Sequence, residues 1–169
     1  MALFRSKESP LERFLSQLKD PSPEVRRRAA YELSNLGDDR AIPHLIEALS
    51  DADKRVRWRV AYALGDLGEM GLRSDDAYEA LVSHLEAEED WNVRRIIVMS
   101  FRHWDERAVK PLINALDDES KYVRRYAAMT IGLKKSKDAV GRLERLIETE
   151  ESKMVRDYAK WALGEINKS

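Results

Sequence analysis

The chain has no cysteine, and its 169 residues include only 7 glycines and 5 prolines. The absence of cysteine excludes disulfides, thiolate metal sites, cysteine nucleophiles and iron–sulfur clusters. Few glycines and prolines, with no sustained alternation of apolar and polar residues, argue against a turn-rich all-β protein. The longest apolar run, residues 96–99, is too short to span a membrane, and residues 1–7 lack the apolar core of a signal peptide. We therefore expect a soluble, cytoplasmic, helical protein with no membrane partner.

The chain also lacks an excess of charge of one sign. It has 30 Lys and Arg residues and 31 Asp and Glu residues, which gives a net charge of -1. This balance removes any attraction of the whole molecule to nucleic acid or to an anionic membrane, although a local basic patch is compatible with it. Charged residues make up 36% of the chain, against about 25% in typical globular proteins. Such a surplus requires long solvated faces, which stacked helices provide.

A Val-Arg pair recurs along the chain and organises it into repeats. Each pair opens an apolar stripe with helical spacing, such as Val56, Val60, Ala63, Leu64 and Leu67, which predicts an amphipathic helix. A shorter amphipathic segment precedes each of these helices, so each repeat is predicted to be a short helix, a tight turn and a longer helix. The pairs are Val25-Arg26, Val56-Arg57, Val93-Arg94, Val123-Arg124 and Val155-Arg156.

A preferred helix N-cap stands three residues before each valine. Its side-chain oxygen is expected to accept a hydrogen bond from an N–H group of the first turn. These residues are Ser22, Asp53, Asp90, Ser120 and Ser152.

The segment Ala-Ile-Pro-His-Leu-Ile-Glu-Ala-Leu-Ser-Asp at residues 41–51, followed by Val56-Arg57, resembles the HEAT-like repeat of the phycocyanobilin-lyase type. Residues 108–118 with Val123-Arg124 show the same pattern, and the resemblance covers about residues 10–168. It implies an all-α fold, an α-solenoid of five HEAT-like helical hairpins with about ten helices, in a single domain over residues 1–169. The repeats are placed at about 10–39, 40–75, 76–106, 107–137 and 138–168.

Two positions on the longer helices change at the ends of the array. The residue five positions after the valine is small or β-branched in four repeats, but in the last repeat it is Lys160. The residue seven positions after the valine is small or β-branched in the later repeats, but in the first repeat it is Glu32. These positions point about 200° apart on a helix. We interpret the two charges as caps that close a five-repeat unit, because each stands where a neighbouring repeat is missing.

Repeat three departs from the pattern. Arg102 replaces the glycine found at Gly65, Gly132 and Gly164. Trp104 replaces a smaller apolar residue, and the connection over residues 69–76 is extended. Either this is a local kink in the superhelix, or it is a functional loop over one rim.

The sequence offers no catalytic set. His44, His84 and His103 lack metal-ligand spacing, and no glycine-rich phosphate loop or nucleophile elbow is present. We expect no catalytic residue, no metal and no cofactor. The chain is expected not to be an enzyme, with a lyase-subunit role beside a partner left open.

An acidic residue stands five positions before each valine, on the turn between the two helices of a repeat. Each acid can pair with the arginine of its own or the adjacent repeat, and planar guanidinium groups suit such contacts. We interpret the arrangement as a structural ladder and not as an anion site. Its members are Asp20, Arg26, Asp51, Arg57, Arg94, Asp118, Arg124 and Arg156, with Glu88 and Glu150.

The resemblance implies that the longer helices line a concave surface. Their outward positions hold 8 of the chain's 13 aromatic residues, with 9 Lys or Arg against 4 Asp or Glu. This composition is typical of binding surfaces, although the rings could instead cover the stems of neighbouring arginines. The predicted binding face consists of Arg27, Arg28, Tyr31, Trp58, Arg59, Tyr62, Trp91, Arg95, Met99, His103, Tyr122, Arg125, Tyr126, Tyr158 and Trp161.

Three functions fit this face. The first is a non-enzymatic interaction scaffold, acting as a monomer, that binds an acidic or extended protein or peptide partner. The second is nucleic-acid binding, with cations on phosphates and rings on bases, which the net charge of -1 disfavours. The third follows from the resemblance: a bilin chromophore lyase subunit or chromophore-binding accessory protein, with arginines on propionates and rings on pyrroles.

Overall fold

The computed structural model describes residues 8–168, which form ten α-helices and short 3-10 segments and contain no strand. The expectation that residues 1–7 carry no signal peptide lies outside the described residues. Between residues 8 and 168, no helix is both long enough and apolar enough to cross a membrane. The helices are α1 (Pro10–Gln17), α2 (Pro23–Leu36), α3 (Ile42–Ala48), α4 (Lys54–Glu69), α5 (Asp75–Ala87), α6 (Trp91–Ser100), α7 (Val109–Asn114), α8 (Lys121–Lys134), α9 (Val140–Thr149) and α10 (Lys153–Ile166).

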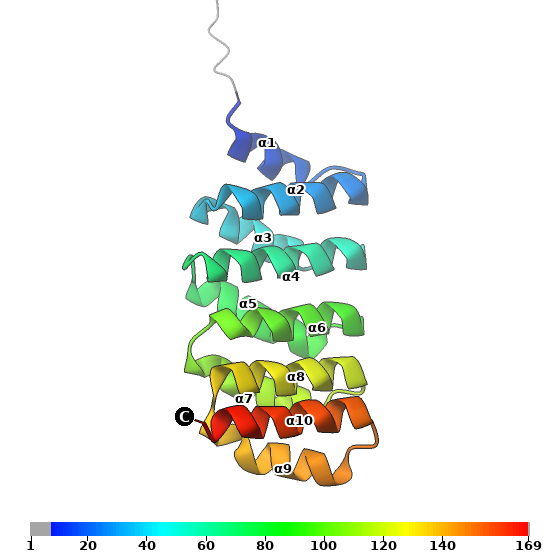
Figure 1. The fold of residues 1–169 in the computed structure, drawn as a ribbon. Coiled ribbons are helices and arrows are strands. Elements are labelled where there is room, and N and C mark those ends of the chain that lie inside the picture. The colour runs from blue at the N-terminus through cyan, green and yellow to red at the C-terminus, as the bar shows by residue number, and fades with distance from the viewer. Residues whose placement is uncertain (1–7, 169) are drawn as a thin grey trace, which may run out of the picture.

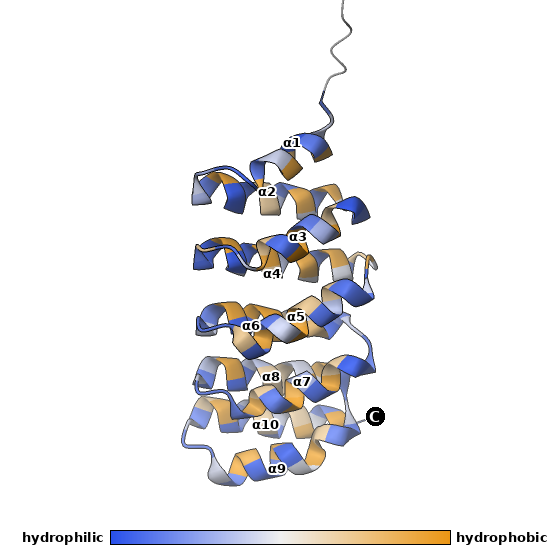
Figure 2. Cartoon of the chain, turned by 180° about the vertical axis from the view of Figure 1, so that it is seen from behind, coloured by the Kyte–Doolittle hydropathy of each residue, from blue (hydrophilic) through white to orange (hydrophobic). Residues whose placement is uncertain are grey.

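Consecutive helices pair into five hairpins that stack into one elongated molecule (Figure 1). The second helices of the hairpins, α2, α4, α6, α8 and α10, lie side by side in one layer. The first helices form the other layer, which faces the viewer in Figure 2. The prediction of an all-α solenoid is confirmed.

Small side chains let the second helices approach one another closely. Ala30 and Ala61, five residues after their valines, and Ala63, seven residues after its valine, have no exposed surface. A Cβ atom added to Gly65 of α4 would lie 2.9 Å from the Cβ of Ser100 in α6. Larger apolar residues such as Leu33 and Leu67 fill the space between the layers and are fully buried. Burying one such side chain contributes about 1.5–3 kcal/mol.

The second helices begin where the N-cap residues predict, but only two caps bond as expected. The Asp53 carboxylate accepts the Arg55 N–H at 2.8 Å, and Asp90 accepts the N–H of Asn92 at 3.0 Å. Ser22, Ser120 and Ser152 accept no such bond. The prediction was wrong for these serines. Their own N–H groups donate to the acid two residues earlier, at 2.8 Å in each case, as the N–H groups of Asp53 and Asp90 also do.

Repeat three does not have a short first helix and a long second helix. Its first helix, α5, has 13 residues, and its second, α6, has only 10. After Ser100 the chain turns through a 3-10 segment (η2, Phe101–His103) that directs Trp104 into the core, where its ring centroid lies 5.7 Å from that of Tyr78. Trp104 is 4% exposed, so filling the core with this large ring accounts for the early end of α6.

The connection between repeats two and three is also shorter than expected. α4 continues to Glu69 and α5 begins at Asp75, so only residues 70–74 are irregular. Gly71 adopts a φ of 86°, and the Leu72 N–H closes the helix on the Leu67 carbonyl at 2.9 Å. The expected extended linker over residues 69–76 was wrong, because most of the extra residues lengthen helices.

Candidate partner-binding face

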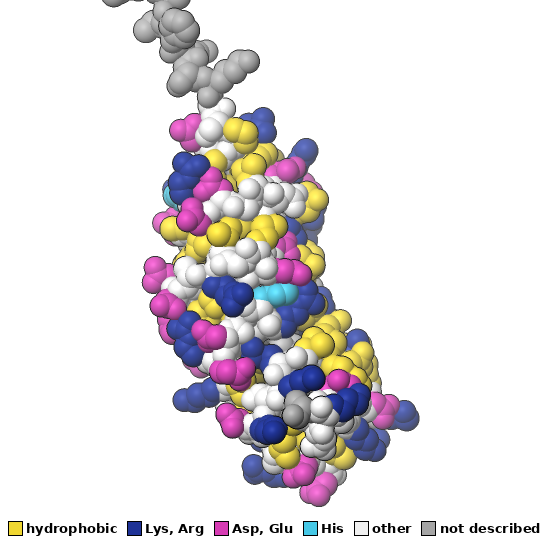
Figure 3. Space-filling model, turned by 60° about the vertical axis from the view of Figure 1, so that its left-hand side comes forward, with side chains coloured by type: hydrophobic (Ala, Val, Ile, Leu, Met, Phe, Trp, Pro, Cys, Tyr) yellow, Lys and Arg dark blue, Asp and Glu magenta, His cyan; other side chains and the backbone are white. Residues whose placement is uncertain are grey.

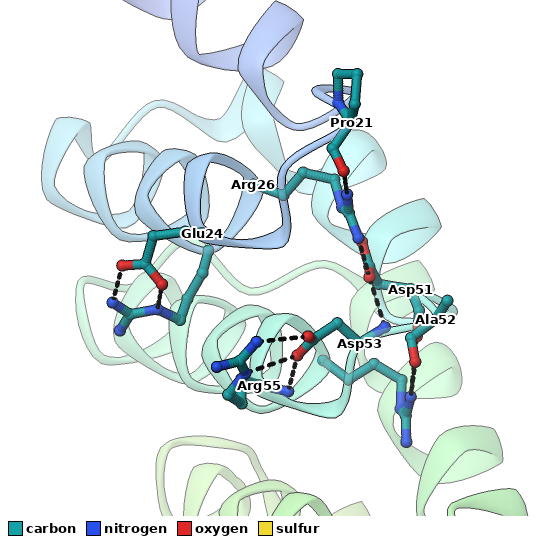
Figure 4. Close-up of polar contacts among 9 residues, drawn as sticks. Pro21, Glu24, Arg26, Asp51, Ala52, Asp53 and Arg55 are labelled. Atoms are coloured by element: carbon teal, nitrogen blue, oxygen red, sulfur yellow. Dashed lines mark hydrogen bonds and ion pairs between the residues drawn. The ribbon is translucent and has the colours of Figure 1, made fainter.

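Four arginines of the Val-Arg pairs join consecutive repeats through two parallel hydrogen bonds to a carboxylate. In each case the acid belongs to the following repeat and lies on its inter-helix turn. Figure 4 shows the first pair, Arg26 with Asp51, whose Nε–Oδ2 distance is 2.6 Å. The others are Arg57–Glu88 at 2.7 Å, Arg94–Asp118 at 2.7 Å and Arg124–Glu150 at 2.6 Å.

The same arginines are also anchored to the turn of their own repeat. Arg57 Nη1 donates to the Asp51 carbonyl at 2.9 Å and to the Ala52 carbonyl at 3.3 Å. Burial works to raise the pKa of Glu88, but the bonds from Arg57 and from the Asp90 N–H outweigh burial and hold that pKa below its ordinary value. The guanidinium groups of these four arginines are therefore engaged within the fold and are not free to bind a ligand.

The two terminal members of the ladder have no such partner among the described residues. Asp20, in the first repeat, accepts the Ser22 N–H at 2.8 Å but makes no ion pair within residues 8–168. Arg156, in the last repeat, donates to the Glu150 and Glu151 carbonyls at 2.5 and 2.8 Å. No carboxylate of the described chain pairs with Arg156. The predicted ion pairs are therefore formed between consecutive repeats, but Asp20 and Arg156, the two end members of the ladder, form none within residues 8–168.

The predicted binding face lies on the layer of second helices, with His103 just after α6 in η2. Arg28, Tyr31, Tyr62, Trp91, Tyr122 and Trp161 are exposed. Half-buried members are Arg27, Trp58, Arg95, Met99, His103, Arg125, Tyr126 and Tyr158. The expectation that Arg59 faces solvent was wrong: only 8% of this residue is exposed.

Arg59 is buried between rings of two adjacent helices. Its guanidinium carbon lies 4.8 Å from the ring centroid of Tyr31 and 5.0 Å from that of Tyr62. Its Nη2 donates to Ser34 Oγ at 2.8 Å and lies 3.4 Å from Asp66 Oδ2. Burial lowers the pKa of Arg59 and raises that of Asp66. Arg59 thus joins α2 to α4 and is not available to a partner.

The middle of the face, between α6 and α8, presents exposed rings beside arginines. Trp91 and Tyr122 stack with centroids 4.9 Å apart, and they are 42% and 39% exposed. Arg95 lies 5.1 Å from the Tyr126 ring centroid, and its Nη2 donates to the Asn92 side-chain oxygen at 2.8 Å. Neither contact neutralises the positive charge of Arg95.

Arg125 continues this arrangement from α8 to α10. Its guanidinium lies 4.8 Å from the Tyr126 centroid and 4.7 Å from the Tyr158 centroid. Its Nη2 also approaches the Tyr158 hydroxyl at 3.3 Å. The rings orient this cation but supply no carboxylate.

The cations of this surface differ in whether they form an ion pair within the chain. Arg27, Lys54 and Arg55 each pair with an acidic residue of the chain, at 2.5, 2.9 and 2.9 Å. Arg95, Arg125 and the nearby Lys121, whose Nζ lies 5.5 Å from the Tyr122 centroid, pair with no carboxylate of residues 8–168. The positive charge that is not compensated by the fold is therefore centred on α6 and α8. Lys121 and Asn92 are missing from the predicted set, although both lie at the outward positions where the cations and rings were counted.

Two hollows lie beside this centre, both on the side of α4. The first, with a volume of about 540 Å³, lies at the N-terminal ends of α2, α4 and α6, between Trp58 and Trp91. The second, of about 40 Å³, lies beside Tyr62, Met99 and His103. Figure 3 looks toward the C-terminal ends of the second helices and shows basic and acidic side chains interspersed there.

His103 lies in a polar cluster with Arg102 and Glu69. Arg102 Nε donates to its Nε2 at 2.5 Å, and Glu69 Oε2 lies 3.5 Å from the same nitrogen. Burial and the charge of Arg102 lower the pKa of His103. No group of metal-ligating side chains occurs within the described part of the chain.

Comparisons with known proteins agree with the fold of the chain. A family model of HEAT repeats matches residues 11–102 and 109–169. No curated protein matches the sequence.

Several solved structures share the fold at low sequence identity. The complex of CpcE and CpcF of phycocyanin lyase from Nostoc sp. PCC7120 aligns with a TM-score of 0.76 and 21% identity, covering 100% of this chain and 70% of that one. A designed armadillo repeat protein in complex with the peptide (KR)4 aligns with a TM-score of 0.67 and 20% identity, covering 91% of this chain and 80% of that one. An engineered protein aligns with a TM-score of 0.67 and 20% identity, covering 94% of this chain and 79% of that one.

Proposed function

The chain belongs to the HEAT-repeat family, and we propose that it is a non-enzymatic scaffold that binds an acidic, extended segment of a protein partner across the layer of second helices. The observation that carries the proposal is the set of three uncompensated cations, Arg95, Lys121 and Arg125, beside the exposed Trp91–Tyr122 stack. Aromatic and arginine side chains dominate the energetics of protein interfaces.

Electrostatics favours an acidic partner. Lys121 is the first residue of α8, and Arg95 and Arg125 are the fifth residues of α6 and α8. The N-terminal ends of α2, α4, α6, α8 and α10 lie along the same edge of the layer (Figure 1), and helix N-termini carry a partial positive charge. Carboxylates of a partner segment would be drawn to this centre, where they displace no existing ion pair. The solenoid similar to this chain that was solved with the basic peptide (KR)4 supports peptide binding as a use of such an architecture.

Selection of peptides tests the proposal directly. A phage-displayed library of random 12-residue peptides is selected against the whole chain at low ionic strength. We expect enrichment of Asp and Glu together with aromatic residues, and affinity that falls as salt rises, because charge steering is screened. Enrichment of basic peptides, or of none, would contradict the proposal.

Variants then locate the site on the molecule. Arg95→Gln and Arg125→Gln should weaken binding of the selected peptide by about tenfold or more, because each removes an uncompensated charge. Arg55→Gln and Lys54→Gln are matched controls, since their cations already pair with Asp53 and Asp90. Equal effects in both groups would place the peptide elsewhere on the surface.

Two further probes cover the other ligand classes. A fluorescent 20-mer of single-stranded DNA that binds as tightly as the selected peptide would favour the nucleic-acid function. A shifted visible absorbance band on mixing with a bilin would favour the chromophore function. We expect neither.

A further inference from the structure

The larger hollow beside the uncompensated cations has a volume of about 540 Å³ and lies among the N-terminal ends of α2, α4 and α6. This volume falls within the range of small-ligand pockets, about 300–1,000 Å³, so the hollow has room for an aromatic side chain. Two rings line it, Trp58 from α4 and Trp91 from α6. The other lining residues are Glu24, Arg27, Lys54, Arg55, Asp90 and Asn92.

The charged side chains of this hollow are already paired with one another or with the adjoining turn. The three pairs are Arg27–Glu24 at 2.5 Å, Lys54–Asp90 at 2.9 Å and Arg55–Asp53 at 2.9 Å. An anion that entered the hollow would have to compete with a carboxylate for one of these cations. A cation that entered it would meet three like charges. The hollow therefore favours a neutral side chain.

The two rings of the hollow are each held by a ring that lies outside it. Trp91 stacks on Tyr122 of α8, with centroids 4.9 Å apart, and Trp58 packs against Tyr62 of α4, with centroids 5.7 Å apart. Side chains that are fixed before binding lose little conformational freedom when a ligand arrives, which favours affinity. Contacts between rings are favourable beyond the area that they bury, so these two walls suit an aromatic ligand.

Asn92 joins the hollow to the nearest uncompensated cation. Its side-chain oxygen accepts hydrogen bonds from Arg95 Nε at 3.0 Å and from Nη2 at 2.8 Å. Arg95 also follows Trp91 by four residues in α6, so the two side chains lie on one face, about 5–6 Å apart. Lys121 and Arg125 belong to α8, about 8–10 Å further across the layer. An extended chain advances about 3.3 Å per residue, so about two to five positions separate a residue in the hollow from an acid at these cations.

We propose that the hollow between Trp58 and Trp91 is a subsite for one neutral aromatic side chain of the bound segment. The acidic residues of the same segment occupy Arg95, Lys121 and Arg125. The inference rests on the proposed function, because the acids bring the ring to the hollow. The three cations all lie on the α6 and α8 side of the hollow. The partner therefore carries the ring at one end of its acidic run, about two to five positions from the nearest acid.

Fluorescence anisotropy of the whole chain with four labelled synthetic peptides tests the proposal. The acid peptide carries four glutamates among glycines and serines. Two ring peptides add one tryptophan, either three positions before the first glutamate or three after the last, because either chain direction can bring a ring to the hollow. At least one ring peptide should bind about tenfold or more tightly than the acid peptide. The fourth peptide has a fifth glutamate in place of the tryptophan of the tighter ring peptide, and it should bind within about threefold of the acid peptide.

A variant of the chain locates the bound ring. Trp58→Leu removes one wall of the hollow from α4, whereas the three cations belong to α6 and α8. It should reduce the gain from the tryptophan to less than about threefold and leave the affinity for the acid peptide unchanged. Trp161→Leu is the matched control, because this exposed ring of the same layer lies outside the hollow. It should keep the full gain.

Photo-crosslinking places the ring on the native chain, without any substitution in it. Benzoylphenylalanine replaces the tryptophan of the tighter ring peptide, and mass spectrometry identifies the labelled residues. We expect labels within residues 24–27, 54–58 and 90–92, which contain every residue that lines the hollow. Labels found only outside these ranges would overturn the proposal.

The acid peptide measures the proposed function, and the gain from the tryptophan measures the subsite. No binding of any peptide would contradict both. Binding of the acid peptide with a gain below about threefold for both ring peptides would overturn the subsite alone. A gain that survives Trp58→Leu, or a fifth glutamate that binds as tightly as the tryptophan, would also overturn it and leave the proposed function standing.

Discussion

At the scale of single residues, arginine serves the fold and the surface in different ways. Arg57 and Arg94 use Nε and Nη2 for a carboxylate and Nη1 for carbonyl oxygens, so most of their donors are satisfied. Arg95 and Arg125 contact mainly the faces of tyrosine rings, which orient a cation without neutralising it. The neighbours of a guanidinium therefore decide whether it acts in stability or in binding.

Removing a ladder arginine should lower stability. Arg57→Ala or Arg124→Ala leaves a carboxylate that is at most 4% exposed without its partner, at a cost of about 1–3 kcal/mol in the free energy of unfolding. Urea denaturation measures this difference. Arg55→Ala, whose side chain is 68% exposed, should leave the midpoint unchanged. An unchanged midpoint for both ladder variants would show that the rungs contribute nothing to stability.

Two tryptophans of repeat three should behave in opposite ways. Trp91 is 42% exposed and Trp104 is 4% exposed. Trp91→Ala should change the free energy of unfolding by less than about 1 kcal/mol but weaken binding of an acidic peptide by about 2 kcal/mol or more. Trp104→Ala should cost about 3–5 kcal/mol of stability because it empties the core. If Trp91→Ala melts as early as Trp104→Ala, the stacked pair belongs to the core and not to a binding surface.

Residue types in the sequence predicted where aromatic and basic side chains gather, but not which of them are committed to the fold. Arg59 and Arg95 belong to the same set of outward positions. Arg59 is buried because Ser34, from the preceding repeat, and Asp66 converge on it. Such partners lie 25 and 7 residues away in the chain, and only the stacking of helices reveals them.

At the scale of elements, helix spacing depends on glycines at a single register. A Cβ on Gly132 would lie 2.7 Å from the Trp161 ring and 2.8 Å from the Ala162 backbone. Gly132→Ala should therefore force α8 and α10 apart and cost about 1–3 kcal/mol.

Gly164→Ala is the matched control for that change. It lies at the same register of α10 with open space around it, and alanine should raise stability by about 0.5–1 kcal/mol because it favours helix more than glycine does. Thermal unfolding of both variants gives the comparison. A stabilising Gly132→Ala would show that the two helices are not held at close approach.

Helix positions were largely predictable because the Val-Arg pairs and N-cap residues repeat. The lengths of the helices could not be predicted in the same way, since they depend on what each helix packs against. α6 ends at Ser100 because the chain must direct Trp104 toward Tyr78 and Phe101, whose ring centroid lies 6.0 Å from that of Tyr78. The three serine caps also failed. The bond from the N–H of the cap residue to the ladder acid does not explain this failure, because Asp53 and Asp90 make the same bond and still cap their helices.

At the scale of the whole molecule, each repeat contacts its neighbours and the ladder spans every internal boundary. Repeat arrays of this kind have stabilities that are approximately sums of unit and boundary contributions. A solvent condition that weakens all rungs at once therefore acts on the entire solenoid, while a single substitution acts on one boundary. Acid is such a condition, because every rung contains a carboxylate.

The direction of the pH effect follows from the ladder acids. Burial works to raise the pKa of Asp51 and Glu88, but hydrogen bonds from Arg26, Arg57 and backbone N–H groups hold both below their ordinary values. The bond from Arg124 lowers the pKa of Glu150 despite its burial. A carboxyl group with a depressed pKa in the folded state stabilises the fold above its unfolded pKa of about 4, and this contribution is lost as pH falls through the folded value.

The free energy of unfolding should therefore stay level near neutral pH and decline from about pH 5 downward. Glu88→Gln removes one of the responsible groups, so it should be less stable than the native chain at pH 7, by about 1–3 kcal/mol, yet lose less stability between pH 5 and pH 2. Urea titrations at several pH values measure both quantities, with the exposed Glu148→Gln as control. If Glu88→Gln shows the same acid slope as the native chain, protons are not binding at the ladder. In that case the rungs would stabilise the solenoid through geometry and not through their charge.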